Sequence, residues 1–178
     1  MDKPGTPWSV PVAVEDIPDA GLHMGIEAPA EVREAVAALA GLRDLPRLSA
    51  VFDLTRQGAS VHVVGAVRGT VGQTCVVTLE PIHNEVDERI DLLFAPGVAA
   101  KAGDVEIKTA DSAGEPPEIL VDGRIDLGAL AAEFLMLGID PYPRKAGVAF
   151  AAPKADEGGE RPFAALAALK KRMGTGPT

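Results

Sequence analysis

The chain has very little cysteine and few aromatic residues. Cys75 is the only cysteine among 178 residues. A single cysteine excludes an intrachain disulfide and any structural zinc site that needs two or more cysteines of one chain. Aromatic residues make up 4% of the chain, too few for a cluster that stacks bases or sugars. The core must therefore come from Val, Leu, Ile and Ala.

The chain also lacks the sequence marks of export or membrane insertion. Its first residues, Met1 to Gly5, do not show the basic and then apolar order of a signal peptide. The longest apolar stretch, Leu127 to Ile139, is interrupted by Glu133. Together with the single thiol, these features lead us to expect a cytoplasmic protein that makes no membrane contact.

The formal net charge of -9 argues against a protein that coats nucleic acid nonspecifically, because neutralising phosphates requires a basic surface. The charge is unevenly placed. Acids predominate from Asp104 to Asp122, whereas Arg161 to Arg172 contains four bases and no acid. This asymmetry indicates how a partner could be oriented, and it does not identify that partner.

Length and composition favour one α+β domain over residues 1–150, followed by a linker and a short basic helix over 151–178. Two prolines mark the first strand as an edge strand, and the short turns between later strands favour an antiparallel sheet that curls or closes into a barrel-like form. Residues 95–117 are expected to form a loop. The alternation of apolar residues predicts strands at Trp8–Val14, Leu48–Thr55, Val61–Val67, Val71–Leu79, Asn84–Phe94 and Ile119–Ile125.

Two main helices are expected from apolar residues at helical spacing. One covers Glu31 to Ala40, and the other begins at an Asp126 cap, continues through Leu137 and ends at Gly138. A short closing helix is expected from Phe163 to Met173.

The residues favour binding over catalysis. A nucleophilic Cys75 needs a base and a lowered pKa, and lone buried cysteines are usually inert. His83 is the histidine nearest to Cys75 in sequence, so a thiol- or metal-dependent enzyme using these two residues stays open as the alternative. No histidine spacing matches a known zinc site, and no glycine-rich segment has the lysine of a phosphate loop. We expect no cofactor and no small-molecule substrate.

Basic side chains are the candidates for contact with a partner. These side chains could contact phosphate. Lysines at the end of a helix could equally be present for solubility and for their favourable interaction with the helix dipole. The candidate residues are Arg56 and Arg68 on the predicted hairpin, and Arg161, Lys170, Lys171 and Arg172 in the C-terminal segment.

Three segments together resemble the YceD family of large-subunit ribosomal RNA accumulation proteins. They are Gly72 to Ile82, Asp122 to Gly128 with the apolar helix that follows, and Arg161 to Lys171. The residues that carry the resemblance most clearly are Gln73, Cys75, Leu79, Glu80, Pro81, Asp126 and Glu133.

The resemblance implies a non-enzymatic bacterial factor that supports accumulation of large-subunit ribosomal RNA and ribosome assembly. Its partner would be ribosomal RNA or a large-subunit ribosomal protein. Many relatives carry a second cysteine where this chain has Thr78, and further cysteines where it has Pro141 to Lys145. A metal role of those relatives is therefore not carried over to this chain.

Overall fold

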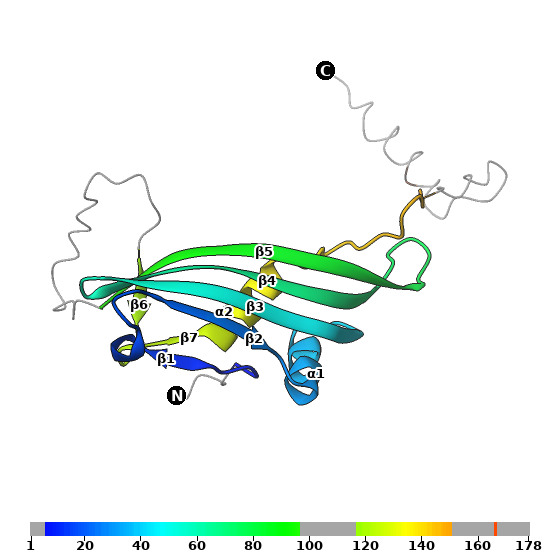
Figure 1. Ribbon diagram of the computed structural model, residues 1–178. Coiled ribbons are helices and arrows are strands. Elements are labelled where there is room, and N and C mark those ends of the chain that lie inside the picture. The colour runs from blue at the N-terminus through cyan, green and yellow to red at the C-terminus, as the bar shows by residue number, and fades with distance from the viewer. Residues whose placement is uncertain (1–5, 97–116, 151–165, 167–178) are drawn as a thin grey trace, which may run out of the picture. The chain divides into compact units, whose positions relative to one another are not determined.

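A computed structural model describes residues 6–96, 117–150 and 166. The chain divides into two units, residues 1–148 and 149–178, and the fold below is that of the first unit. The predicted closing helix, Phe163 to Met173, lies outside the described residues apart from Leu166, as does most of the predicted loop 95–117. The elements, labelled in Figure 1, are β1 (Pro11–Ala13), a 3-10 turn η1 (Val14–Asp16), β2 (Leu22–Glu27), α1 (Ala30–Leu39), β3 (Asp44–Gln57), β4 (Ser60–Thr74), β5 (Pro81–Pro96), β6 (Glu118–Leu120), β7 (Arg124–Asp126) and α2 (Leu127–Leu137).

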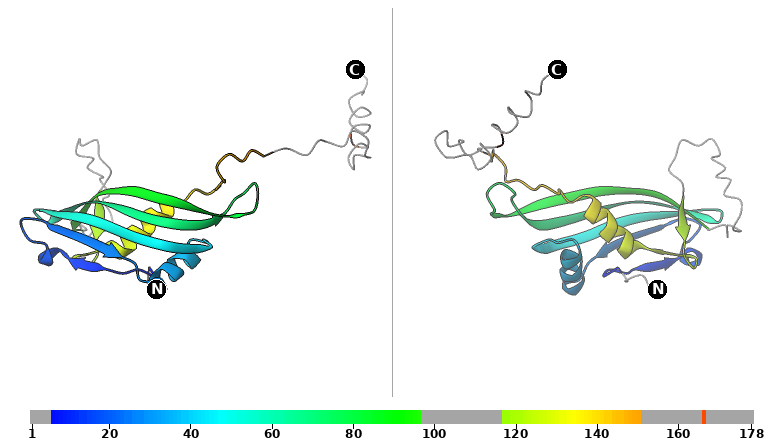
Figure 2. Two further views of the ribbon diagram at one scale, coloured as in Figure 1. Left: turned by 45° about the vertical axis from the view of Figure 1, so that its right-hand side comes forward. Right: turned by 180° about the vertical axis from the view of Figure 1, so that it is seen from behind.

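The main sheet is open and mixed. Its strand order is β2-β3-β4-β5-β6, with antiparallel pairing except between β5 and β6, which run parallel. The structure is α+β, but the predicted curled or barrel-like antiparallel sheet is wrong. The two helices and the small β1-β7 sheet lie on one side of it (Figures 1 and 2). Because this layer buries the apolar face, the sheet does not have to close.

Several strand boundaries differ from those that the alternation predicts. The runs Val61–Val67 and Val71–Leu79 belong largely to one strand, β4, which ends at Thr74 and leaves Cys75 to Leu79 in a loop. The predicted strand Ile119–Ile125 is divided into β6 and β7 by a turn. In this turn Asp122 and Gly123 have positive φ angles of 51° and 67°. Strand β2 was not predicted.

The predicted first strand does pair, but not in the main sheet. It is reduced to β1, which pairs with β7 in a separate two-stranded sheet, with Pro11 opposite Asp126. This pairing brings the start of the chain to the start of α2. Both predicted main helices are confirmed, and the Asp126 side chain caps α2 by accepting a hydrogen bond from the Ala129 amide.

The core lies between the sheet and α2. Alternate side chains of β3 and β4, among them Phe52, Val63 and Val67, are fully buried on the inner face. Helix α2 crosses this face, as the rear view in Figure 2 shows, and contributes the buried Leu135. At Gly69 of β4 the approach is so close that a Cβ would lie 2.6 Å from Leu135 Cδ1. Glycine is therefore what lets α2 rest directly on the strand.

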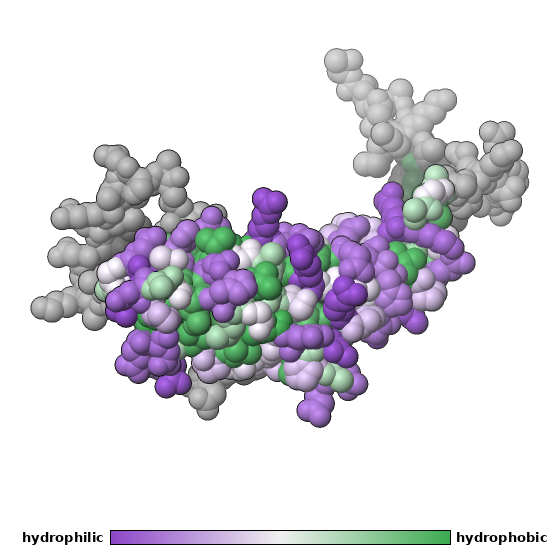
Figure 3. All heavy atoms as spheres, in the orientation of Figure 1, coloured by the Kyte–Doolittle hydropathy of each residue, from purple (hydrophilic) through white to green (hydrophobic). Residues whose placement is uncertain are grey.

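The outer face of the sheet is open to solvent and carries mixed charges. Hydrophilic and apolar residues are interspersed on the side of the molecule seen in Figure 3. Each of the three histidines lies within hydrogen-bond distance of an aspartate on this face: His23 with Asp53, His62 with Asp91 and His83 with Asp44, at 2.7, 2.7 and 2.9 Å. Neither helix in the described part of the chain has the length and apolar character needed to cross a membrane.

Candidate interaction site

The β4-β5 loop is the centre of the candidate site. Two backbone hydrogen bonds of 2.9 Å close it, one from the Cys75 amide to the Glu80 carbonyl and one from the Leu79 amide to the Cys75 carbonyl. Leu79 has a φ of 61°, in the left-handed region that is unfavourable for residues other than glycine. Its side chain is 75% exposed. The loop thus holds a large apolar side chain in solvent at some cost in backbone energy.

The segment that follows α2, residues 139–148, lies against this loop. The Val76 amide donates to the Pro143 carbonyl at 2.9 Å, and Gln73 Nε2 donates to the Asp140 carbonyl at 2.8 Å. Pro143 is buried, whereas Tyr142 beside it is 69% exposed. The two segments therefore form one braced unit whose exposed apolar side chains include Val76, Leu79 and Tyr142.

The buried Cys75 thiol joins the two segments. Its Sγ accepts hydrogen bonds from the amides of Thr78, within the loop, and Lys145, in the second segment, both at 3.4 Å. The Thr78 hydroxyl, together with these two amides and that of Val77, lowers the pKa of Cys75 to about 6, against the opposing effect of burial. A thiolate acceptor at this point strengthens the bonds that hold the segments together.

An ion pair adds a second link between the segments. Lys145 Nζ lies 2.9 Å from Glu80 Oε2. The hydrogen bond and charge of Lys145 lower the pKa of Glu80, and the hydrogen bond and charge of Glu80 raise the pKa of Lys145. Both side chains are about half exposed, so water screens the pair. The ion pair therefore positions the two segments and contributes little to the stability of the fold.

His83, the predicted partner of Cys75 in the enzymatic alternative, makes a different contact. Its Nε2 lies 2.9 Å from Asp44 Oδ1 on the exposed face of the sheet. The groups that hydrogen-bond the Cys75 thiol are backbone amides, including those of Thr78 and Lys145, and the Thr78 hydroxyl, which are donors and not bases. Within the described residues no group of three or more His, Cys, Asp or Glu side chains is placed to hold a metal ion.

Two further signature residues belong to the α2 region, Asp126 as the cap that precedes the helix and Glu133 on the helix itself. Asp126 accepts hydrogen bonds from Ser9 Oγ at 2.6 Å, from the Val10 amide at 2.8 Å and from the Ala129 amide at 3.1 Å. It therefore fixes the start of α2 to the chain before β1. Glu133 is exposed on the helix and borders two hollows beside it.

Of the predicted basic residues, the two that the structure describes, Arg56 and Arg68, do not lie together. Arg68 lies on the outer face of the sheet and pairs with Asp87, with Nε 3.0 Å from Oδ2. Arg56, near the end of β3, stands opposite Val61, whose side chain faces inward. Arg56 and Asp122 both border another hollow. Arg161, Lys170, Lys171 and Arg172 lie outside the described residues.

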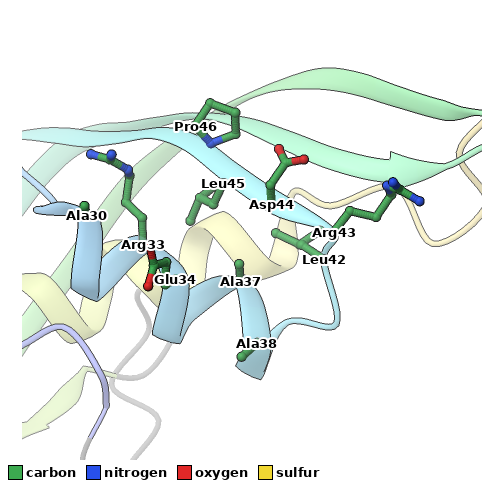
Figure 4. A pocket seen from close by; sticks show the side chains of 10 residues that line it. All are labelled: Ala30, Arg33, Glu34, Ala37, Ala38, Leu42, Arg43, Asp44, Leu45 and Pro46. Atoms are coloured by element: carbon green, nitrogen blue, oxygen red, sulfur yellow. The ribbon is translucent and has the colours of Figure 1, made fainter.

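Another hollow, of about 400 Å³, lies between α1 and the start of β3 (Figure 4). Arg33 and Arg43 stand at its two sides, with Ala37 and Leu45 between them. Arg33 Nη1 donates to the Ala28 carbonyl at 2.9 Å, which ties this guanidinium to the entrance of α1. None of the signature residues borders this hollow.

Sequence reasoning identified Gln73, Cys75 and Glu80 but missed the residues that complete the unit, Thr78 and Lys145. The prolines on both sides of Tyr142 favour an extended conformation of residues 141–143, and this is the one local signal in the segment. Nothing in the pattern indicated that this segment returns to the β4-β5 loop, 70 residues away at the contact of Lys145 with Cys75.

Comparison with protein-family models gives a match over residues 63–170 to the family described as Large ribosomal RNA subunit accumulation protein YceD. The chain belongs to the YceD family. The matched region is more than half of the chain and contains the β4-β5 loop, α2 and the segment that braces the loop. Comparisons with curated proteins and with solved structures gave no match. The resemblance seen in the sequence is confirmed at the level of the YceD family.

Proposed function

We propose that this chain is a non-enzymatic cytoplasmic factor that supports accumulation of large-subunit ribosomal RNA and ribosome assembly by binding ribosomal RNA or a large-subunit ribosomal protein. The observation that carries the proposal is membership of the YceD family, whose name describes large ribosomal RNA subunit accumulation.

The geometry of the braced unit, the β4-β5 loop with residues 139–148, supports binding as the mode of action. Val76, Leu79 and Tyr142 present exposed apolar surface on two segments that hydrogen bonds hold in one conformation. Such preorganisation lowers the entropy lost when a partner docks. The left-handed backbone conformation of Leu79 is a further reason to assign a role to the β4-β5 loop, because backbone strain is concentrated at functional sites.

The test is genetic complementation. Depletion of the protein should lower large-subunit ribosomal RNA and the large-subunit peak in a sucrose gradient, and the unaltered chain should restore both. Leu79→Gly should fail to restore them although it folds, because glycine relieves left-handed strain of roughly 1 kcal/mol while removing the exposed side chain. Val64→Thr, an exposed change on the outer face, is the matched control and should complement. Unchanged RNA after depletion would overturn the proposal.

The basic residues give a separate arm of the same test. Replacing Arg161, Lys170, Lys171 and Arg172 by glutamine should impair complementation if these side chains bind phosphate, and Arg56→Gln with Arg68→Gln tests the hairpin pair. Pull-down with and without nuclease then separates an RNA partner from a protein partner.

The enzymatic alternative makes an opposite prediction for His83. This side chain is exposed and contacts Asp44, so His83→Gln leaves the core untouched. Binding without catalysis requires that His83→Gln complements fully. Loss of complementation by a folded His83→Gln protein, together with the same loss in Cys75→Ser, would favour the enzyme.

A further inference from the structure

Two hollows adjoin each other along one flank of α2. The first, of about 640 Å³, lies between α1 and α2 and is bordered by Leu39 and Met136. The second, of about 570 Å³, lies between α2 and the β6-β7 turn and is bordered by Ile119 and Val121. Both are also bordered by Thr6, Ala129 and Glu133, so the hollows are neighbours. We call them together the α2 groove.

The α2 groove exposes large apolar side chains from α1, from β6 and from the β6-β7 turn. Leu39 is 60% exposed, Ile119 66% and Val121 69%. Apolar side chains scattered singly over a surface are ordinary, but here they border one concave region. Concave apolar surface of this kind marks a binding site for a ligand or a protein segment.

The charges of the α2 groove select the class of partner. Glu133 borders both hollows and Glu118 borders the second, and neither forms an ion pair with any residue that the structure describes. Arg124 is the one base among the described lining residues of the two hollows. Carboxylates in this position repel phosphate and attract lysine or arginine. A basic protein segment therefore fits the groove better than RNA does.

The geometry suits a short amphipathic helix. Helix α2 has 11 residues, which at the rise of an α-helix gives a length of about 16 Å, or about three turns. An amphipathic helix laid along such a flank places apolar side chains three or four residues apart into the groove. Its lysine or arginine would then meet Glu133, where the two hollows join.

We propose that the α2 groove binds a basic amphipathic segment of a large-subunit ribosomal protein, with apolar side chains against Leu39, Met136 and Ile119 and a basic group at Glu133. This inference rests on the proposed function and goes further by assigning a surface and a class of partner. The α2 groove differs from the exposed apolar surface around Leu79, because the groove combines concave apolar surface with carboxylates.

The test uses the purified full-length chain and each purified large-subunit ribosomal protein, with large-subunit ribosomal RNA as a parallel probe, at 0.15 M salt. Fluorescence anisotropy should detect binding of at least one ribosomal protein. Glu133→Lys should weaken that binding at least tenfold, and Leu39→Ser should also weaken it. Glu27→Lys, the same charge change at an exposed position of β2, should alter it less than twofold. Circular dichroism checks that the variants are folded.

Several results would overturn the inference. They are the absence of binding to every ribosomal protein, binding that Glu133→Lys leaves unchanged, and RNA binding that Glu133→Lys strengthens. A concentration-dependent dimer abolished by Glu133→Lys would instead assign the α2 groove to a second copy. Tighter binding after deletion of residues 149–178 would assign it to the chain's own C-terminal segment.

Complementation separates failure of this inference from failure of the proposed function. If depletion lowers large-subunit RNA and Glu133→Lys complements fully, the α2 groove is not the contact and the proposed function stands. If depletion leaves the RNA unchanged while Glu133 is required for binding in vitro, the proposed function fails and the α2 groove remains a binding site.

Discussion

Asp126→Ala should destabilise the fold through one side chain that serves two elements. The carboxylate accepts hydrogen bonds from the Val10 amide, just before β1, and from the Ala129 amide, in the first turn of α2. It also accepts a bond from the Ser9 hydroxyl. Alanine leaves both amides without their acceptor and removes the side-chain link between the N-terminal strand and the helix.

The expected magnitude follows from these contacts. Loss of a helix N-cap costs about 1 kcal/mol, and a hydrogen bond to a charged group contributes about 1.5 to 3 kcal/mol. The Ser9 contact is exposed and adds little. We expect Asp126→Ala to lower the free energy of unfolding by roughly 2 to 4 kcal/mol. Asp126→Asn should cost less, because its amide oxygen can still accept from the backbone.

Urea unfolding followed by circular dichroism at pH 7 measures this loss from the shift in midpoint at unchanged slope. Asp19→Ala is the control, because Asp19 is exposed in a turn, and it should lie within about 0.5 kcal/mol of the unaltered chain. A loss below about 1 kcal/mol for Asp126→Ala would refute the assignment of Asp126 as the link between β1 and α2.

The same variant has a defined pH dependence. Partial burial acts to raise the pKa of Asp126, but the hydrogen bonds from Ser9 and from the amides of Val10, Ala129 and Gly128 together hold it below its ordinary value of 3.8. The unfolded chain therefore binds the proton first as pH falls. The stabilisation is complete above pH 3.8 and disappears as pH falls through the lowered native pKa. The gap between the unaltered chain and Asp126→Ala should narrow below about pH 4. A gap that stays constant down to pH 3 would contradict a role for the charge.

Three further predictions concern the loop, the core and the surface. Thiolate absorbance at 240 nm should titrate with a pKa of about 6 for Cys75, and Thr78→Val should raise that pKa toward 9.0 by removing a hydroxyl hydrogen bond. Gly69→Ala should destabilise the fold by roughly 1 to 3 kcal/mol by overpacking, and adding Leu135→Val should recover part of the loss. Arg68→Ala should change stability by less than about 1 kcal/mol, because its ion pair is largely exposed.

Each of these has a clear contrary result. A Cys75 pKa that is the same in Thr78→Val and the unaltered chain would refute the hydroxyl bond. Additive losses in the double variant would show that Gly69 and Leu135 are not in contact in solution. A loss above about 2 kcal/mol for Arg68→Ala would mean that the outer-face pair contributes more than an exposed ion pair can.

Much of the local structure was predictable because it depends on neighbouring residues. The Asp126 cap and the apolar positions up to Leu135 define α2 within a few residues. The alternation around Phe52 and Val63 likewise predicts inward and outward faces of β3 and β4. Cys75 was misplaced on a strand because Val76 and Val77 are β-branched, and periodicity does not reveal that the backbone of Cys75 closes a loop with Glu80.

The sequence alone thus determined the two helices, the alternation in β3, β4 and β5, and the YceD family of the chain. Tertiary structure alone decided that the sheet stays open, that β6 runs parallel to β5, and that Lys145 meets Cys75. It also decided that Glu133 stands in a groove between elements that are distant in sequence. The physical reason is that helix formation and alternation depend on residues a few positions apart, whereas these pairings join segments whose contact no local pattern encodes.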